Sequence, residues 1–222
     1  MKVKIVHASD LHGQFIKLPE SDMYIFSGDI LSNFGMTMDV VAEYEATAQT
    51  DWLRRKGKGF LRKFLGSRDA PVVVCRGNHD FSYLAPLFGG EVYAIQEPYE
   101  THNILGLEVG GFRGINYICG DWSDEIDPTE FYNIMRKVPS CLDIMVTHSP
   151  PHTILDGRFG EKWGINAFAN WINNQLYSNE RLPKLFCFGH IHNDRGMLTW
   201  DDGTIFSNAA TTFNEIEIDN EI

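Results

Sequence analysis

The sequence predicts an α/β protein built from two mixed sheets flanked by helices. Several short runs are apolar nearly throughout, which is typical of strands covered on both faces. Segments with apolar residues at helical spacing separate some of these runs, and an Asp-Gly pair between two later runs indicates a hairpin. With 222 residues, the chain (1–222) is expected to form one domain with a substantial core.

Three segments should form helices, and five of the apolar runs should form a central sheet. The first helix is expected over residues 37–56, because apolar side chains recur at helical spacing from Val41 to Trp52, and a short apolar segment follows at 60–65. Asp127 and Pro128 suit the N-cap and first position of a helix over 127–137, and another helix should span 166–177. The predicted central strands are 3–8, 23–27, 72–75, 142–147 and 185–188.

A second, antiparallel set of strands is expected from the remaining apolar segments. The clearest signal is the turn Asp201-Asp202-Gly203, which separates two strand-like runs and predicts a hairpin. The motifs described below should then gather along one rim of the sheets. The predicted strands of this second set are 91–95, 104–112, 197–200, 204–208 and 213–218.

Charge and cysteine content narrow the function classes. The formal net charge of -11 disfavours tight nonspecific binding to duplex nucleic acid, which requires many basic side chains. The four cysteines form no C-x-x-C pair, and Cys75 and Cys187 lie in apolar runs, which favours buried, reduced thiols. The apolar run at residues 3–6 is too short for a signal or membrane segment, so we expect a soluble cytoplasmic protein without a membrane partner.

Five short motifs occur in order along the chain and contain the chemistry. Two of their carboxylates, one amide oxygen and four of their imidazoles are candidate ligands, which is enough to hold two divalent cations. Four of the five directly follow a strand-like run, and open α/β sheets bind ligands at the carboxyl ends of their strands. The motifs are Asp10-Leu11-His12-Gly13, Gly28-Asp29, Gly77-Asn78-His79-Asp80, Thr147-His148 and Gly189-His190-Ile191-His192.

The spacing within the motifs suits metal binding. Alternate residues of an extended segment point the same way, so Asp10 with His12, and His190 with His192, can face one site. Imidazole and carboxylate ligands without thiolate suit manganese, iron, nickel or zinc. Taken alone, each short motif is a commonplace turn or surface pair. Their joint occurrence, with five of the eight histidines inside them, favours a metal site.

The five motifs resemble the signature of the calcineurin-like metallophosphoesterases, D-x-H, G-D, G-N-H-[DE], H and G-H-x-H, over most of the chain. The resemblance implies a small, single-domain, phosphodiesterase-type member with an α/β sandwich of two mixed sheets. It also implies a catalytic role for Asp29 and for His79, the latter as general acid or transition-state stabiliser. The implied ligands are Asp10, His12, Asp29 and His192 for one metal, and Asp29, Asn78, His148 and His190 for the other, with Asp29 bridging.

One position departs from the family pattern. Many members have an acidic residue three positions after the bridging aspartate, where it supports the catalytic histidine, and this chain has Ser32. Either Ser32 or another group must orient His79, or the enzyme prefers substrates with good leaving groups. The expected reaction is attack of metal-activated hydroxide on phosphorus, with two divalent cations as cofactors, manganese first and iron, zinc or nickel as alternatives.

The expected substrate is a small, nucleotide-like phosphodiester. The loop from Thr147 to Asp156 resembles the corresponding loop of small phosphodiesterases, and we expect Asn78, His152 and Arg113 to contact substrate. Four aromatic residues near the motifs are candidates for stacking a nucleobase, although core or lid positions are the commoner outcome for each. They are Phe15, Tyr117, Trp122 and Trp163.

Two other functions remain open. A basic cluster keeps a DNA or RNA nuclease in consideration, although the acidic net charge, the acidic stretch 121–130 and the solvated face of a helix argue against it. A noncatalytic, protein-binding scaffold of the same fold is disfavoured, because every implied ligand is present. The basic residues are Arg54, Arg55, Lys56, Lys58, Arg62 and Lys63.

Overall fold

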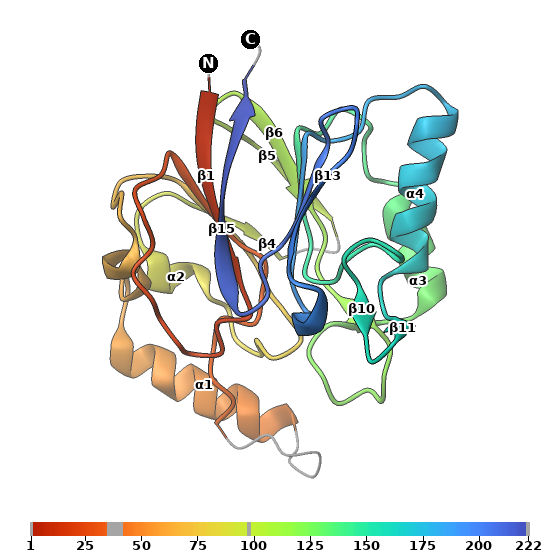
Figure 1. Ribbon diagram of the computed structural model, residues 1–222. Helices are drawn as coiled ribbons and strands as arrows, with labels where there is room; N and C mark the ends of the chain where they lie inside the picture. Colours follow the sequence, from red (N-terminus) through yellow and green to blue (C-terminus); the bar gives the residue numbers. More distant parts are fainter. Residues whose placement is uncertain (1, 35–41, 97–98, 221–222) are drawn as a thin grey trace.

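The computed structural model describes residues 2–34, 42–96 and 99–220 of the chain. Two mixed sheets pack against each other, and helices cover their outer faces (Figure 1). This arrangement confirms the predicted fold class. It also explains why so many strands are apolar on both faces, since one face of each sheet meets the other sheet and the opposite face meets helices.

The first sheet has five strands in the order β15-β1-β2-β3-β4. Strands β1 to β4 are parallel, and only the edge strand β15 is antiparallel to its neighbour. Its strands are β1 (Lys2–Ser9), β2 (Met23–Phe26), β3 (Val72–Cys75), β4 (Val92–Ile95) and β15 (Thr212–Asp219).

The second sheet has six strands in the order β13-β14-β12-β9-β6-β5. Its four inner strands are parallel, and the edge strands β13 and β5 are antiparallel to their neighbours. Its strands are β5 (Glu100–Ile104), β6 (Leu107–Gly111), β9 (Ile144–Val146), β12 (Leu185–Phe188), β13 (Gly196–Thr199) and β14 (Ile205–Asn208).

The predicted strands exist, but their grouping into one central sheet was wrong. The first three predicted central strands lie in the first sheet and the other two in the second, while β4 and β15 join the first sheet instead of an antiparallel set. Hydrophobicity on both faces identifies a buried strand, but it does not say which of two sheets contains it.

The predicted single strand 104–112 is also corrected. Leu105 and Gly106 both have positive φ, 53° and 79°, and they form the turn of a hairpin between β5 and β6. A Leu-Gly pair lacks the usual Asn-Gly or Asp-Gly signal of such a turn. The sequence pattern therefore missed both the turn and β5.

Most of the predicted helices are confirmed. Helix α4 spans Asn166–Tyr177, and α3 spans Pro128–Met135 with the Asp127 carboxylate accepting the Thr129 N–H at 2.8 Å. Helix α1 spans Ala42–Lys56, whereas Val41 and the rest of the predicted segment 37–41 lie outside the described residues. Shorter elements are η1 (Leu61–Phe64), α2 (Ala85–Phe88) and η2 (His192–Asp194), with the two-residue strands β7 (Ile115–Asn116), β8 (Glu125–Ile126), β10 (Gly157–Arg158) and β11 (Glu161–Lys162).

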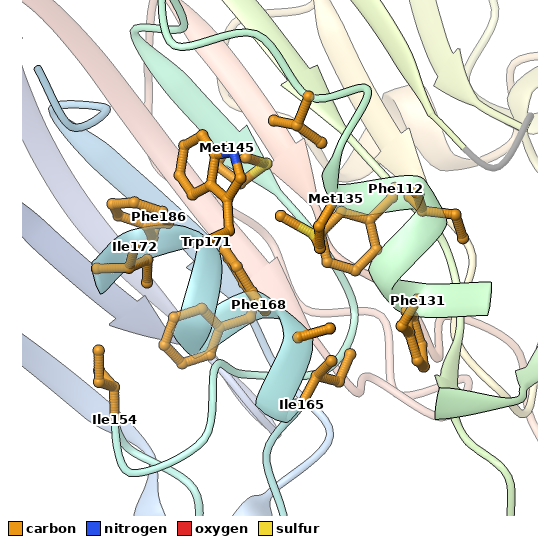
Figure 2. Close-up of a cluster of buried hydrophobic side chains, with 14 of the residues drawn as sticks. Phe112, Phe131, Met135, Met145, Ile154, Ile165, Phe168, Trp171, Ile172 and Phe186 are labelled. Carbon is orange, nitrogen blue, oxygen red and sulfur yellow. The ribbon is translucent and has the colours of Figure 1, made fainter. Parts of the chain in front are cut away.

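The core has three parts. One cluster fills the space between the sheets, with Val3 and Ile5 of β1 facing Ile144 and Val146 of β9. A second lies between the first sheet and the segments η1 and α2. The third lies between the second sheet and helices α3 and α4, where Phe168 is among the fully buried side chains (Figure 2). Among the described helices, none combines the length and hydrophobicity needed to cross a membrane.

Candidate metal centre

The five motifs converge where the parallel strands of both sheets end. They follow β1, β2, β3, β9 and β12, whose carboxyl ends lie along one rim of the sandwich. Along a strand, every second side chain faces the space between the sheets, and this alternation continues up to the rim. On β9, for example, Ile144 and Val146 face inward, and His148 continues the same alternation. The strand topology therefore brings together residues that are up to 182 positions apart.

Each of the two predicted carboxylate ligands divides its oxygens between the protein and the centre. Asp10 Oδ2 accepts the Ser9 hydroxyl at 2.6 Å and the His190 backbone N–H at 2.9 Å, while Oδ1 lies 3.0 Å from His192 Nε2. Asp29 Oδ1 accepts the His79 backbone N–H at 2.8 Å. The hydrogen bonds fix both carboxylates, and one oxygen of each remains directed at the imidazoles.

Three imidazoles surround the free oxygen of Asp29. Its Oδ2 atom lies 3.4 Å from His148 Nε2, 3.9 Å from His79 Nε2 and 4.0 Å from His12 Nε2. Two groups of residues each have ligand atoms within 4.8 Å of one another. The groups are Asp10, His12 and His192, and Asp10, Asp29 and His148.

Asn78 and His190 complete the predicted ligand set. Asn78 Oδ1 lies 3.1 Å from His148 Nε2, and the His148 Nδ1–H donates to the Ser27 carbonyl at 2.8 Å. This second bond directs Nε2 toward Asn78 and Asp29. The half-buried ring of His190 lies 5.1 Å from the His148 ring. All seven predicted ligands are therefore found around one centre.

The pKa values of the site indicate that Asp29 is ionised and attracts positive charge. Burial opposes ionisation of Asp29, but the surrounding imidazoles, His148 foremost, lower its pKa well below the usual range. Burial likewise disfavours the charged form of His148, yet the Asp29 carboxylate outweighs it and raises the pKa of His148 to about 9. Burial lowers the pKa of His190 to about 3. Two buried carboxylates in this setting are suited to a bound cation.

The backbone adopts uncommon conformations at the predicted ligands. Asp10, His12, Asp29 and His190 all have positive φ, between 44° and 66°. Such values cost on the order of 1 kcal/mol or more for residues other than glycine, and they cluster at functional sites. Gly77 has a different role, because a Cβ there would lie 2.1 Å from Asp29 Oδ1. Close packing around the carboxylate therefore requires glycine.

The residues fit a bound divalent metal. His12 faces the centre through Nε2, and two groups of residues there have ligand atoms close enough to share a cation. The chemistry of these donors is the test of the fit. The donors are carboxylate, imidazole and amide groups, which suit manganese, iron, nickel or zinc.

The comparison with known proteins agrees with this geometry. A family model described as calcineurin-like phosphoesterase matches residues 3–194. The chain belongs to the calcineurin-like phosphoesterase family. Membership supports a phosphoric ester hydrolase, and it confirms the family that the five motifs indicated.

Individual relatives of this phosphoesterase are distant. UPF0046 protein K07C11.7 of Caenorhabditis elegans is 26% identical over 227 residues, which covers 94% of this chain and 69% of that protein. A putative 5'-nucleotidase from Staphylococcus aureus shares the fold, with a TM-score of 0.56, 13% identity, and coverage of 100% of this chain and 51% of that chain. A 5'-nucleotidase precursor from Thermus thermophilus gives a TM-score of 0.42 and 12% identity, with coverage of 100% of this chain and 52% of that chain. The phosphoesterase chain spans about half the length of these two solved structures.

His79 lies beside the predicted ligands and is oriented by Asn33. Its Nδ1 atom is 2.8 Å from Asn33 Oδ1, so the ring donates N–H to the amide oxygen and directs Nε2 toward Asp29. Burial is the main cause that lowers the pKa of His79. Ser32, by contrast, donates its hydroxyl to the His12 carbonyl at 3.2 Å. The group that supports His79 is therefore the residue after the position where many family members have an acid.

Helix α1 holds the loop that contains His79. Gln49 is fully buried, and its amide donates to the His79 carbonyl at 2.6 Å while accepting the Phe81 N–H at 2.8 Å. Asp80 is also buried and accepts the backbone N–H groups of Ile30 and Leu31. Burial and the nearby Asp29 charge raise the pKa of Asp80 to about 7. These contacts tie the loops after β2 and β3 together.

The other two predicted substrate contacts, Arg113 and His152, each lie next to a carboxylate. Arg113 forms an ion pair with Asp124 at 2.9 Å, and Arg76 binds the same carboxylate. His152 lies 3.6 Å from Asp156, in the loop that leads to β10. Both residues are held by carboxylates, and a role for either in binding substrate stays a prediction.

Sequence reasoning missed Asn33 and Gln49 as functional residues. Asn33 lies next to the anomalous Ser32, which was the available signal that a neighbouring residue replaces the missing acid. Gln49 is a polar residue within an amphipathic pattern and has no local signature. Its importance depends on burial against another segment, which spacing along one helix does not reveal.

Proposed function

We propose that this protein hydrolyses phosphodiesters of small, nucleotide-like molecules in the cytoplasm with the help of two divalent cations, manganese first. Its family supports phosphoric ester hydrolysis in general, and the preference for diesters is our extension. The main support is the convergence of Asp10, Asp29, His12, His148 and His192 with ligand atoms within 4.8 Å in two groups.

The ligands are expected to divide as the family resemblance implies. Asp29 Oδ2 lies between His12, from the first predicted set, and His148, from the second, which favours a bridging role. When bound, divalent cations neutralise phosphate oxygens and lower the pKa of water toward neutrality. The predicted sets are Asp10, His12, Asp29 and His192, and Asp29, Asn78, His148 and His190.

His79 is the residue that we expect to assist the leaving group. Its Nδ1–H is held by Asn33, so Nε2 is the atom that faces the reacting phosphate and donates a proton to the leaving oxygen when His79 is charged. A neutral amide stabilises a charged imidazole less than a carboxylate does. The chain should therefore favour esters with good leaving groups.

The proposal is tested with bis-p-nitrophenyl phosphate, a diester, and p-nitrophenyl phosphate, a monoester. The protein is treated with a chelator, dialysed, and assayed before and after addition of Mn²⁺. We expect p-nitrophenol release from the diester to exceed that from the monoester, to disappear after chelation and to return with Mn²⁺. Full activity of the demetallated protein would contradict the metal mechanism, and faster monoester hydrolysis would overturn the diester preference.

Two members of the basic cluster contact other parts of the protein, which weakens the nuclease alternative. Arg62 donates to the carbonyls of Phe88 and Ala70, and Lys63 lies 4.0 Å from the centre of the Phe60 ring. Cleavage of DNA with a steep dependence on salt would restore the nuclease interpretation. Metal binding without hydrolysis of any ester would favour the scaffold interpretation.

A further inference from the structure

We propose that Trp122 forms the wall of an aromatic subsite next to His79, which binds a nucleobase or another planar ring attached to the leaving oxygen. This inference rests on the proposed function, because it assigns the leaving-group side of the centre to His79. It names a chemical class of substrate and a specificity residue outside the five motifs.

Trp122 lies beside His79. The centres of the two rings are 4.5 Å apart with an angle of 52° between their planes, and His79 Nε2 lies 3.9 Å from Asp29 Oδ2. The indole is therefore separated from the centre by a single imidazole. A group attached to the oxygen that receives a proton from His79 must lie close to the indole.

Hydrogen bonds within the protein hold the loop that contains Trp122. The Glu125 carboxylate accepts the Trp122 N–H at 3.0 Å and also the N–H groups of Ile118, Cys119 and Gly120, and these bonds lower its pKa against the effect of burial. The Ser123 N–H donates to the carbonyl of Asn78, itself a predicted ligand, at 3.1 Å. A subsite held this rigidly binds without the entropic cost of ordering a loop.

Ion pairs connect the same loop to segments that follow strands of the first and the second sheet. Asp124 follows Trp122 by two positions in the sequence, and its carboxylate binds both Arg76 and Arg113. Arg113 follows β6 and Arg76 follows β3, so the two sheets hold the loop jointly. We infer that Arg113 contributes to substrate binding by positioning this loop.

The surroundings of Trp122 suit an uncharged aromatic ring. Trp122 is only partly buried, and in the same loop Tyr117 and Ile118 are 60% and 51% exposed. Residues 117–124 contain no lysine or arginine, and Asp121 is exposed, while the two arginines that reach this loop are both paired with Asp124. Stacking on an aromatic side chain contributes about 1–3 kcal/mol per base and tolerates every base, whereas an acidic loop disfavours further phosphates. The chemistry fits a nucleoside better than a polynucleotide.

The test compares two methyl phosphodiesters whose leaving alcohols have similar acidity, one with phenol and one with hexafluoroisopropanol. We expect Trp122→Leu to lower the ratio of kcat/KM for the phenyl ester to that for the aliphatic ester about tenfold, mainly through KM, and Trp122→Phe to retain most of the ratio. Tyr177→Leu is the control, because Tyr177 is a 91% exposed aromatic residue at the last position of α4. This end of α4 lies away from β10 and β11 (Figure 1). In the control variant, kcat/KM for both esters should equal that of the unmodified protein.

A binding measurement completes the test independently of turnover. Adenosine, titrated into the manganese-loaded protein by calorimetry, should bind about tenfold more weakly to Trp122→Leu than to the unmodified protein. Equal losses of kcat for both esters with unchanged adenosine binding would overturn the aromatic subsite and leave Trp122 as support for His79. If the unmodified protein hydrolyses neither ester, the proposed function fails, while the adenosine titration still decides the subsite.

Discussion

The two sides of the centre are built in different ways. On the ligand side, Asp10, Asp29 and His148 lie one to three residues after the ends of buried parallel strands, where hydrogen bonds with backbone groups fix them. On the other side, His79 is held by Asn33 from a loop and by Gln49 from helix α1. Trp122, from the loop between β7 and β8, contacts its ring.

This difference shows what a cation requires and what a catalytic histidine requires. A metal accepts few donor types at set distances, so its ligands leave a recognisable pattern in the sequence. Orienting an imidazole requires only a hydrogen-bond acceptor and packed neighbours, and many residue types from many segments satisfy that need. The ligand side should therefore tolerate substitution least.

The strongest test of the ligand side is Asp29→Asn. Its Oδ2 atom lies within 4.0 Å of three imidazoles, so neutralising the carboxylate removes the charge that the predicted cations share. We expect kcat/KM for bis-p-nitrophenyl phosphate to fall by about 10³-fold or more. Asp201→Asn, in an exposed turn, is the matched control and should retain activity. Comparable activity of the two variants would refute the central role of Asp29.

His79→Ala tests the catalytic side. Loss of a general acid costs about 10²-fold to 10⁴-fold, and the loss should grow as the leaving alcohol becomes less acidic. Steady-state rates for a series of substituted aryl esters measure this dependence. A loss of the same size across the whole series would show that His79 does not protonate the leaving oxygen.

Asn33→Ala should have a smaller effect than His79→Ala. Removing the acceptor at 2.8 Å from Nδ1 leaves the ring in place but poorly oriented, which we expect to lower kcat about tenfold with little change in KM. Ser32→Ala is the matched control, because its hydroxyl bonds to the His12 carbonyl and not to His79. A larger loss in Ser32→Ala than in Asn33→Ala would reverse the assignment of the supporting residue.

The pH dependence of the free energy of unfolding tests the buried hydrogen bonds of His7. His7 is fully buried between the Ser207 and Ser27 hydroxyls, at 2.8 Å from each, and burial lowers its pKa from 6.5 to about 3. Between these values the unfolded chain binds a proton that the folded chain does not, so stability from this group falls as pH decreases.

We expect the metal-free protein to lose up to about 1.4 kcal/mol more per pH unit below pH 6 than His7→Gln does. Urea unfolding at several pH values from 7 to 4.5 measures both slopes. The variant lacks only the His7 side chain. The difference between the two slopes of unfolding free energy against pH therefore measures the contribution of His7 apart from that of the other histidines. Parallel slopes for the two proteins would contradict the neutral state of His7.

The sequence predicted the strands, the helices and the residues that gather at the candidate metal centre, because each depends on local pattern or on a fixed set of donors. It did not reveal which sheet each strand joins, since the run at 72–75 and the run at 185–188 are equally apolar yet lie in different sheets. It also missed the Leu105-Gly106 turn, where the positive φ of leucine is stabilised by the surrounding strands. Asn33 and Gln49 act through contacts between distant segments, which no local pattern records.

The most direct test of the account is a crystal structure of the protein grown with Mn²⁺, with anomalous scattering used to locate the ions. We predict two manganese sites per chain, one near Asp10, His12 and His192 and the other near Asn78, His148 and His190, with Asp29 in contact with both. A single ion at this position, or manganese bound only elsewhere on the chain, would contradict the dinuclear centre.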